Sequence, residues 1–184
     1  MEQYIKGVIP YEVSPSWPAE AQKAQAVCAK CYACNNMGKH SSMGFDLCNT
    51  TDCQVYRGTN SATPFTDSIV DDVNGYYVTY NGDIAMTYYH SNSGGHTEDV
   101  ENIWGKYIPY LRGVEDIYLE NPKPYSVSVT LDTITDILQM KGFTKQKITD
   151  YYVSKRSPAG NVLSVTFAQS DGTTLVLSSD KART

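Results

Sequence analysis

Apolar residues recur at helical spacing near the start of the chain. The first of them lie one, three and four positions apart: Tyr4, Ile5, Val8 and Ile9. This pattern predicts a helix over residues 2–13, which the sequence SPSWP then stops. Ser16 before Pro18 indicates the start of a second helix that continues to residue 36, with an acidic residue in its favourable first turn.

The second helix is rich in small residues. One predicted face carries Ala21, Ala24, Cys28, Cys31 and Cys34. Small residues let another backbone approach closely, so the pattern predicts a buried central helix. Its C-x-x-C spacing favours core thiols, because cysteine within a helix behaves as a small hydrophobe. A redox motif would need a helix N-terminus.

The remaining pattern predicts an α+β fold with two parts. Two β-runs over residues 75–91 meet at Asn81-Gly82, the signature of a type I′ hairpin. We expect a main body over residues 1–121, a smaller α/β lobe over residues 122–184, and a cleft between them. The other predicted elements are a polar loop (35–63), a helix (63–73), a glycine-containing loop (91–105), a strand (125–131), a helix (133–142) and three strands (147–154, 161–168 and 173–178).

Composition and charge exclude two classes of function. Hydrophobic residues make up 41% and charged residues 19%, as in a globular protein. The net charge is −5 with no run of Lys or Arg, which argues against nucleic-acid binding. No stretch of about 18 apolar residues exists, so we expect no membrane contact from this segment. The 15 tyrosines suit either sugar binding or simple β-strand preference.

Glu12 is the first candidate for chemistry. It lies in VIPYEVSPSWP among apolar neighbours, a setting that raises the pKa of a carboxyl group and suits it to exchange protons near neutral pH. The alternative interpretation is a solvent-exposed glutamate at the end of a helix.

The loop HSNSGGHTED, residues 90–99, is the second candidate. Two glycines among hydroxyl, imidazole and carboxyl groups give accessible N–H donors at the end of a strand. Such loops often line sites, because rigid strands position them. A polar turn with no further role is the alternative.

A third candidate is a metal site. All five cysteines lie between residues 28 and 53, and His40, Cys48 and Cys53 fall within fourteen residues. Thiolate and imidazole are preferred zinc ligands, and Asp52, Cys34 or water would complete the set. A Cys48–Cys53 disulfide and free thiols are the alternatives.

Several motifs occur in an order that resembles the stage II sporulation protein D family, which includes amidase enhancers. They begin with YIKGVIPYEVSPSWPAEAQKAQAVCAKCYA and continue through DCQVYRG, NGYYVTYNGDIAMTYYHSNSGGHTE and YLRGVED to KRSPAGNVLSVTF. The resemblance covers essentially the whole chain. It implies a lytic transglycosylase that cleaves peptidoglycan glycan strands and leaves 1,6-anhydro-muramyl ends.

The resemblance also assigns residues. The family's catalytic glutamate falls on Glu12, although this chain reads Glu-Val-Ser-Pro where the family has Glu-Met-Pro. Family Lys and Arg positions fall on Lys23 and Lys30, and lysine at the second lacks the bidentate fork of arginine. The expected glycan contacts are Lys23, Lys30, Tyr89, Ser91, Ser93, Gly94, Gly95, His96, Thr97 and Glu98.

Clostridial-type members carry similar zinc ligands, which implies a structural zinc on His40, Cys48 and Cys53. This chain has Asp52 where those members place a histidine. Zinc hydrolysis through an activated water is a further hypothesis.

The expected partners are peptidoglycan glycan strands and a cell-wall amidase of the same process. We expect an extracytoplasmic location and a membrane anchor before residue 1. A glycan-binding module that stimulates an amidase without cleaving glycan is the alternative function. Glu98 is the candidate for a second carboxylate, which a transglycosylase does not require because groups of the sugar itself supply the nucleophile.

Overall fold

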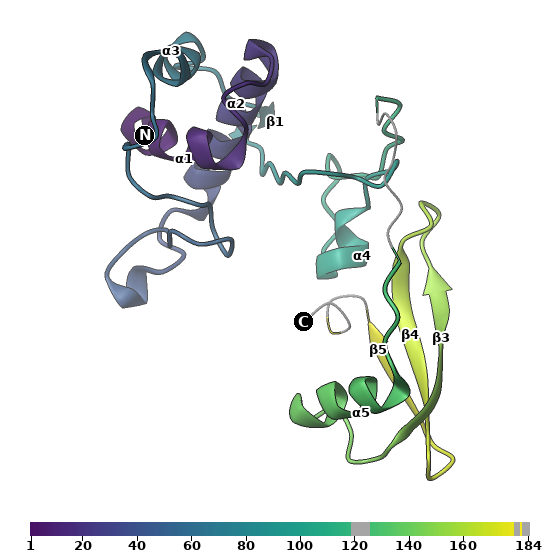
Figure 1. Ribbon diagram of the computed structural model, residues 1–184. Helices are drawn as coiled ribbons and strands as arrows, with labels where there is room; N and C mark the ends of the chain where they lie inside the picture. Colours follow the sequence, from purple (N-terminus) through teal and green to yellow (C-terminus); the bar gives the residue numbers. More distant parts are fainter. Residues whose placement is uncertain (119–125, 179–180, 182–184) are drawn as a thin grey trace. The chain divides into compact units, whose positions relative to one another are not determined.

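The computed structural model describes residues 1–118, 126–178 and 181, which form two compact units, residues 1–90 and 91–184 (Figure 1). The predicted α+β class is confirmed, because helices and antiparallel strands are both present. The predicted boundary between residues 121 and 122 lies outside the described residues. The cleft expected between body and lobe stays a prediction.

Three helices build the first unit: α1 (Glu2–Glu12), α2 (Ala19–Asn36) and α3 (Pro64–Asp72). All three are near their predicted positions. Their shared core consists of Ile5, Val8, Ile9, Val13, Ala26, Ala29, Val70 and Val73. The turn between α1 and α2 is fastened by the buried Gln22, whose amide donates to the carbonyls of Pro15 at 3.2 Å and Trp17 at 2.8 Å.

The predicted face of α2 is buried only in part: Cys31 is buried, and Cys28 and Cys34 are half-buried. Ala21 and Ala24 are exposed, whereas Gln22, Ala26 and Ala29 are buried. Both faces carry small residues, so size alone did not distinguish them. Gln22 is buried with its Nε2 bonded to two backbone carbonyls, while its Oε1 has no partner among the described residues.

The predicted hairpin is present but short. Strands β1 (Thr79–Tyr80) and β2 (Asp83–Ile84) pair antiparallel across Asn81-Gly82. Asn81 has φ 51° and Gly82 has φ 91°, the two positive values that a type I′ turn requires. A single 3₁₀ turn, η1 (Ser41–Met43), interrupts the long loop before α3.

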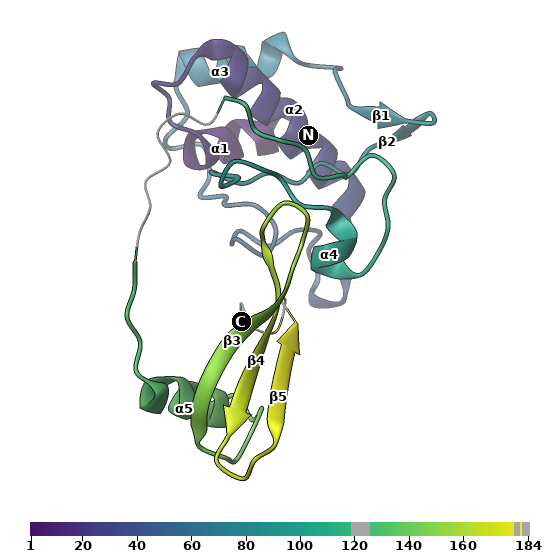
Figure 2. The ribbon, with the colours of Figure 1, turned by 90° about the vertical axis from the view of Figure 1, so that its right-hand side faces the viewer.

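The second unit places one helix on a three-stranded antiparallel sheet (Figure 2). The strands β3 (Ile148–Arg156), β4 (Val162–Gln169) and β5 (Thr174–Ser178) pair in that order and confirm the three predicted strands. Helix α5 (Leu131–Met140) covers one face, and the core between them contains Leu138, Ile148, Phe167 and Leu177.

Two predictions for the second unit are wrong. Helix α4 (Val100–Trp104) lies where a loop was expected. The strand predicted over residues 125–131 is absent from its described part, since residues 126–130 have no regular structure and Leu131 begins α5. Alternating valines suggested a strand, but Val127 is 72% exposed and pairs with no described strand. None of the described helices is long and apolar enough to cross a membrane.

Gly7 generates the first testable prediction. A Cβ added there would lie 2.9 Å from Cδ2 of Tyr56 and closer still to Cε2. Within an ordinary helix, Gly→Ala stabilises by about 0.5–1 kcal/mol. Here we expect Gly7→Ala to lower the free energy of unfolding by about 1–3 kcal/mol, because the ring must move. Urea unfolding measures this change.

The control is the same substitution in a Tyr56→Ala background. Without the ring, Gly7→Ala should become neutral or stabilising. Equal destabilisation in both backgrounds would show that the Tyr56 ring is not the cause.

Candidate active site and metal centre

Glu12 is the last residue of α1, and one of its two carboxylate oxygens is held by a hydrogen bond. Oε1 accepts a hydrogen bond from the backbone N–H of Val55 at 2.8 Å. Oε2 accepts none from the residues that the structure describes. The side chain is half-buried, so the carboxylate is fixed in direction and keeps one oxygen available.

A buried amide lies next to that contact. The side chain of Gln54, 1% exposed, donates from Nε2 to the carbonyl of Ala29 at 3.1 Å and to the hydroxyl of Tyr89 at 2.9 Å. Its Oε1 accepts from the hydroxyl of Tyr4 at 3.1 Å. The network joins α1, α2 and the segment after the hairpin.

Both tyrosines of this network are neutral at pH 7. Burial, with the Glu12 charge as a smaller contribution, raises the pKa of Tyr4 to about 12. Burial also raises the pKa of Tyr89, against the hydrogen bond from Gln54. Tyr89, predicted as a glycan contact, therefore belongs to the hydrogen-bond network of Gln54, the residue next to Val55 in the sequence.

The two predicted cationic contacts are engaged within the first unit. Lys23 forms ion pairs with Glu20 at 3.2 Å and Asp72 at 3.1 Å. Lys30 is 4% exposed, and its ammonium donates to the carbonyl of Val73 at 2.8 Å. Their role as glycan contacts stays a prediction, and the proposal below does not depend on it.

The predicted glycine loop belongs to the second unit and is internally bonded. Ser93 donates to Asp116 at 2.7 Å and accepts from the N–H of Gly95 at 3.1 Å. Gly94, with φ 71°, donates to Asn92 at 2.7 Å. The loop then pairs with residues 114–116 through Thr97, whose N–H donates to the carbonyl of Val114 at 2.8 Å. Ser91 is exposed.

Two further side chains of this loop are also held. Nδ1–H of His96 donates to the carbonyl of Thr97 at 2.6 Å. Glu98 uses both carboxylate oxygens: Oε1 accepts from Asn102 at 2.8 Å and Oε2 from Asn161 at 2.9 Å. Partial burial acts to raise the pKa of Glu98, but hydrogen bonds, from Ser157 first, hold it below its usual value. Glu98 thus has the bonding of a structural carboxylate.

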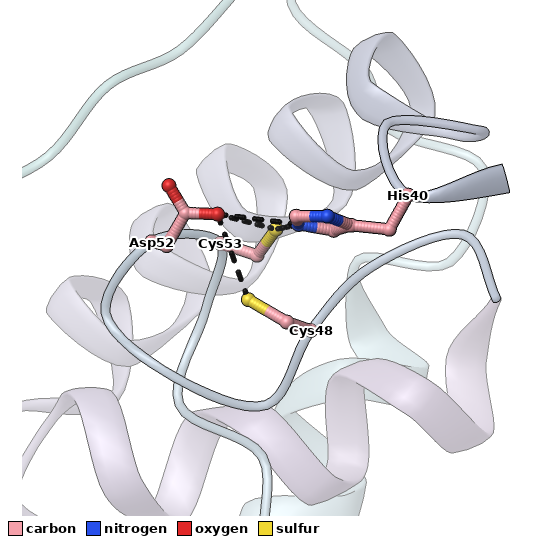
Figure 3. A group of neighbouring side chains, drawn as sticks. All are labelled: His40, Cys48, Asp52 and Cys53. Atoms are coloured by element: carbon pink, nitrogen blue, oxygen red, sulfur yellow. Dashed lines mark hydrogen bonds and ion pairs between the residues drawn. The ribbon is translucent and has the colours of Figure 1, made fainter. Parts of the chain in front are cut away.

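His40, Cys48, Asp52 and Cys53 form one cluster in the long loop (Figure 3). Their ligand atoms all lie within 4.8 Å of one another. Nε2 of His40 is 3.3 Å from Sγ of Cys53 and 3.2 Å from Oδ2 of Asp52. Sγ of Cys48 is 3.8 Å from the same oxygen. Cys34, the other candidate protein ligand, is not part of this group.

The cluster has neighbours that favour its charged forms. A hydrogen bond from Lys39, 3.0 Å from Oδ2, lowers the pKa of Asp52. Hydrogen bonds with Thr50 lower the pKa of Cys48 to about 7. Burial instead raises the pKa of Cys53. All five cysteines are free, so the alternative of a Cys48–Cys53 disulfide is not present in this structure.

Sequence reasoning did not single out Gln54 or Asn161. Gln54 lies in the DCQVYRG motif, so its position was visible, but its burial was not. Asn161 is 63 residues from Glu98 along the chain, and no local pattern connects them.

Comparison with known proteins assigns the family. Residues 1–80 match the model of the family described as Stage II sporulation protein (SpoIID). The chain is 37% identical over 112 residues to an amidase enhancer of Bacillus subtilis, and 29% identical over 146 residues to the stage II sporulation protein D of the same organism. Residues 1–80 of the chain belong to the SpoIID family.

The relatives share only part of their length with this chain. An uncharacterised protein of Brachyspira hyodysenteriae is 43% identical over 115 residues, which is 62% of this chain and 31% of that protein. The amidase enhancer match covers 61% of this chain and 15% of the relative, and the stage II sporulation protein D match covers 71% and 42%. The chain therefore spans less than half of each of these relatives.

Glu98 generates a prediction about pH. A carboxylate whose pKa is lowered by folding stabilises the fold above its unfolded pKa, and this contribution is lost as the pH falls through the folded value. We expect Glu98→Gln to reduce the free energy of unfolding by about 1–3 kcal/mol at pH 7. The difference from the parent should shrink as the pH falls from the ordinary pKa of glutamate through the lowered pKa of Glu98 in the folded protein.

Fluorescence unfolding of the Trp17→Phe protein, whose remaining tryptophan is Trp104 on α4, measures this effect. Glu115→Gln, at an exposed position of the same unit, is the matched control. A pH-independent difference for Glu98→Gln would contradict the structural role of its charge.

Proposed function

We propose that this chain is the glycan-cleaving part of a cell-wall lytic transglycosylase, with Glu12 as the catalytic acid and base. The observation that carries the proposal is the bonding of Glu12. Val55 fixes one carboxylate oxygen, and the other is uncommitted among the described residues. An acid/base residue needs both a fixed direction and a free oxygen.

The proposed reaction needs only one protein carboxyl group. Glu12 donates its proton to the glycosidic oxygen as the bond from C1 of N-acetylmuramic acid to that oxygen breaks. The C6 hydroxyl of the same sugar then bonds to C1, and its proton passes to the Glu12 carboxylate. The products are a free 4-hydroxyl and a 1,6-anhydro end, with no water consumed and the glutamic acid restored.

The family names support a wall function for this chain. Relatives are called stage II sporulation protein D and amidase enhancer. We infer that the chain works outside the cytoplasm on peptidoglycan glycan strands, in a process that also uses a cell-wall amidase. The amidase enhancer relative also supports a second candidate function, in which the chain binds glycan and stimulates the amidase without cleaving.

We also propose that His40, Cys48, Asp52 and Cys53 hold a structural zinc. A tetrahedral ion with bonds of about 2.0–2.3 Å keeps its ligands about 3.3–3.8 Å apart. Four of the separations between ligand atoms lie between 3.2 Å and 4.0 Å, and every pair lies within 4.8 Å, so small side-chain movements would bring the set to this range. Four protein ligands fill a tetrahedral shell, which suits a closed structural site and disfavours the hypothesis of zinc hydrolysis.

Glu12→Gln tests the catalytic proposal. The amide cannot donate a carboxylic proton, so we expect a loss of about 10²–10⁴-fold in the rate at which 1,6-anhydro ends form. Mass spectrometry of digested glycan strands counts these ends. Glu2→Gln, an exposed change on the same helix, should keep the parent rate. Binding to purified sacculi without any anhydro product from the parent would favour the amidase-stimulating alternative.

Metal removal tests the zinc proposal. We expect about one zinc per chain in the purified protein, and loss of that ion in Cys48→Ser, together with a lower thermal midpoint. Elemental analysis and thermal unfolding measure the two effects. Cys34→Ser, outside the cluster, should retain the metal. A parent protein that binds no zinc when saturated with it would refute the site.

A further inference from the structure

The second unit contains a pocket of about 550 Å³ that the proposed reaction does not use. Its wall joins helix α4 to all three strands of the sheet. The lining residues that matter here are Glu101, Asn102, Trp104, Lys155, Leu163 and Ser178. Pockets of about 300–1,000 Å³ that combine an aromatic surface with a few polar groups are typical of small-molecule sites.

Trp104 gives the pocket its apolar surface. The residue is 57% exposed at the end of α4, although burying an indole is strongly favourable. Leu163 of β4 adds to this surface, and Asn102 and Ser178 add polar groups to the lining. A flat ring beside polar side chains matches a pyranose, which has one apolar face of C–H groups and a rim of hydroxyls.

The pocket is lined by one acidic and one basic side chain, and among the described residues only the acidic one forms an ion pair. Glu101 forms an ion pair with Arg112 at 2.6 Å. Lys155 of β3 has no ion-pair partner among the residues described. A ligand carboxylate near Lys155 would therefore gain an ion pair without displacing an existing one.

The walls are held together by Glu98. Its carboxylate accepts from Asn102 on α4 at 2.8 Å and from Asn161, just before β4, at 2.9 Å. Glu98 therefore fastens the helix that carries Trp104 to the strands that carry Lys155 and Leu163.

We propose that this pocket binds a carboxylate-bearing N-acetylated sugar of the wall glycan. The Trp104 indole packs on the sugar ring, and the Lys155 ammonium pairs with the lactyl carboxylate of N-acetylmuramic acid. The identity of the sugar rests on the proposed function. The site itself is built only from residues of the second unit.

Trp17 and Trp104 are the two tryptophans of the chain, which permits a direct measurement. In Trp17→Phe, the emission of Trp104 reports on the pocket. We expect titration with an N-acetylmuramic acid disaccharide to change this emission with saturation. Lys155→Gln should weaken that binding about 10-fold and leave the neutral disaccharide of N-acetylglucosamine nearly unaffected. Lys145→Gln, an exposed lysine outside the lining, is the charge control.

Calorimetry with the otherwise unaltered chain tests the aromatic contact. Trp104→Ala should abolish measurable binding of both disaccharides, whereas Tyr152→Ala, an equally exposed aromatic on β3, should not. Parent-like affinity in both Trp104→Ala and Lys155→Gln overturns the inference, even if Glu12-dependent cleavage is intact. Pocket-dependent binding by a chain that makes no anhydro ends supports the inference and refutes the proposed reaction alone.

Discussion

The buried amide of Gln54 holds together the segments that surround Glu12. It accepts from Tyr4 on α1 and donates to Ala29 on α2 and to Tyr89 after the hairpin. A buried amide that loses a partner retains an unsatisfied polar group, at a cost of about 1–3 kcal/mol. The three contacts therefore support one another. Because Val55 follows Gln54 directly, the same contacts determine where its N–H meets the Glu12 carboxylate.

Other buried polar side chains of the first unit satisfy backbone carbonyls where helices end. Gln22 binds the carbonyls of the turn between α1 and α2, and Lys30 binds the carbonyl of Val73 at the end of α3. The Pro15 and Trp17 carbonyls lie outside the helices and the Val73 carbonyl lies at the end of α3, so helical hydrogen bonds do not satisfy them. Placing the donors on α2 gives the unit a central helix that is polar at selected buried positions, which explains why its sequence lacks a clear apolar stripe.

Local chemistry made much of this fold predictable. Asn81-Gly82 specifies a turn through its backbone conformations, and the apolar spacing of α1 needs no distant partner. The wrong predictions concern segments whose structure depends on contacts with residues far away in the sequence. Val127 lies in a strand-like pattern without a described strand to pair with it, and the packed face of α2 depends on which side chain finds carbonyls outside the helix. That His40, Cys48, Asp52 and Cys53 lie together was largely predictable, because they are close in sequence.

In the candidate site, too, the sequence identifies the candidate residues, but only the structure shows the hydrogen bonds that they make. Glu12 and Glu98 both lie in recognisable motifs, so motif membership cannot separate a reactive carboxylate from a structural one. Their hydrogen bonds differ, and the proposal that Glu12 is the reactive one rests on this difference. Glu98 has both oxygens occupied and a lowered pKa, which opposes proton exchange near neutral pH. Glu12 has one oxygen anchored by a neutral N–H and one uncommitted among the described residues, the arrangement that a single carboxyl group needs to give and recover a proton.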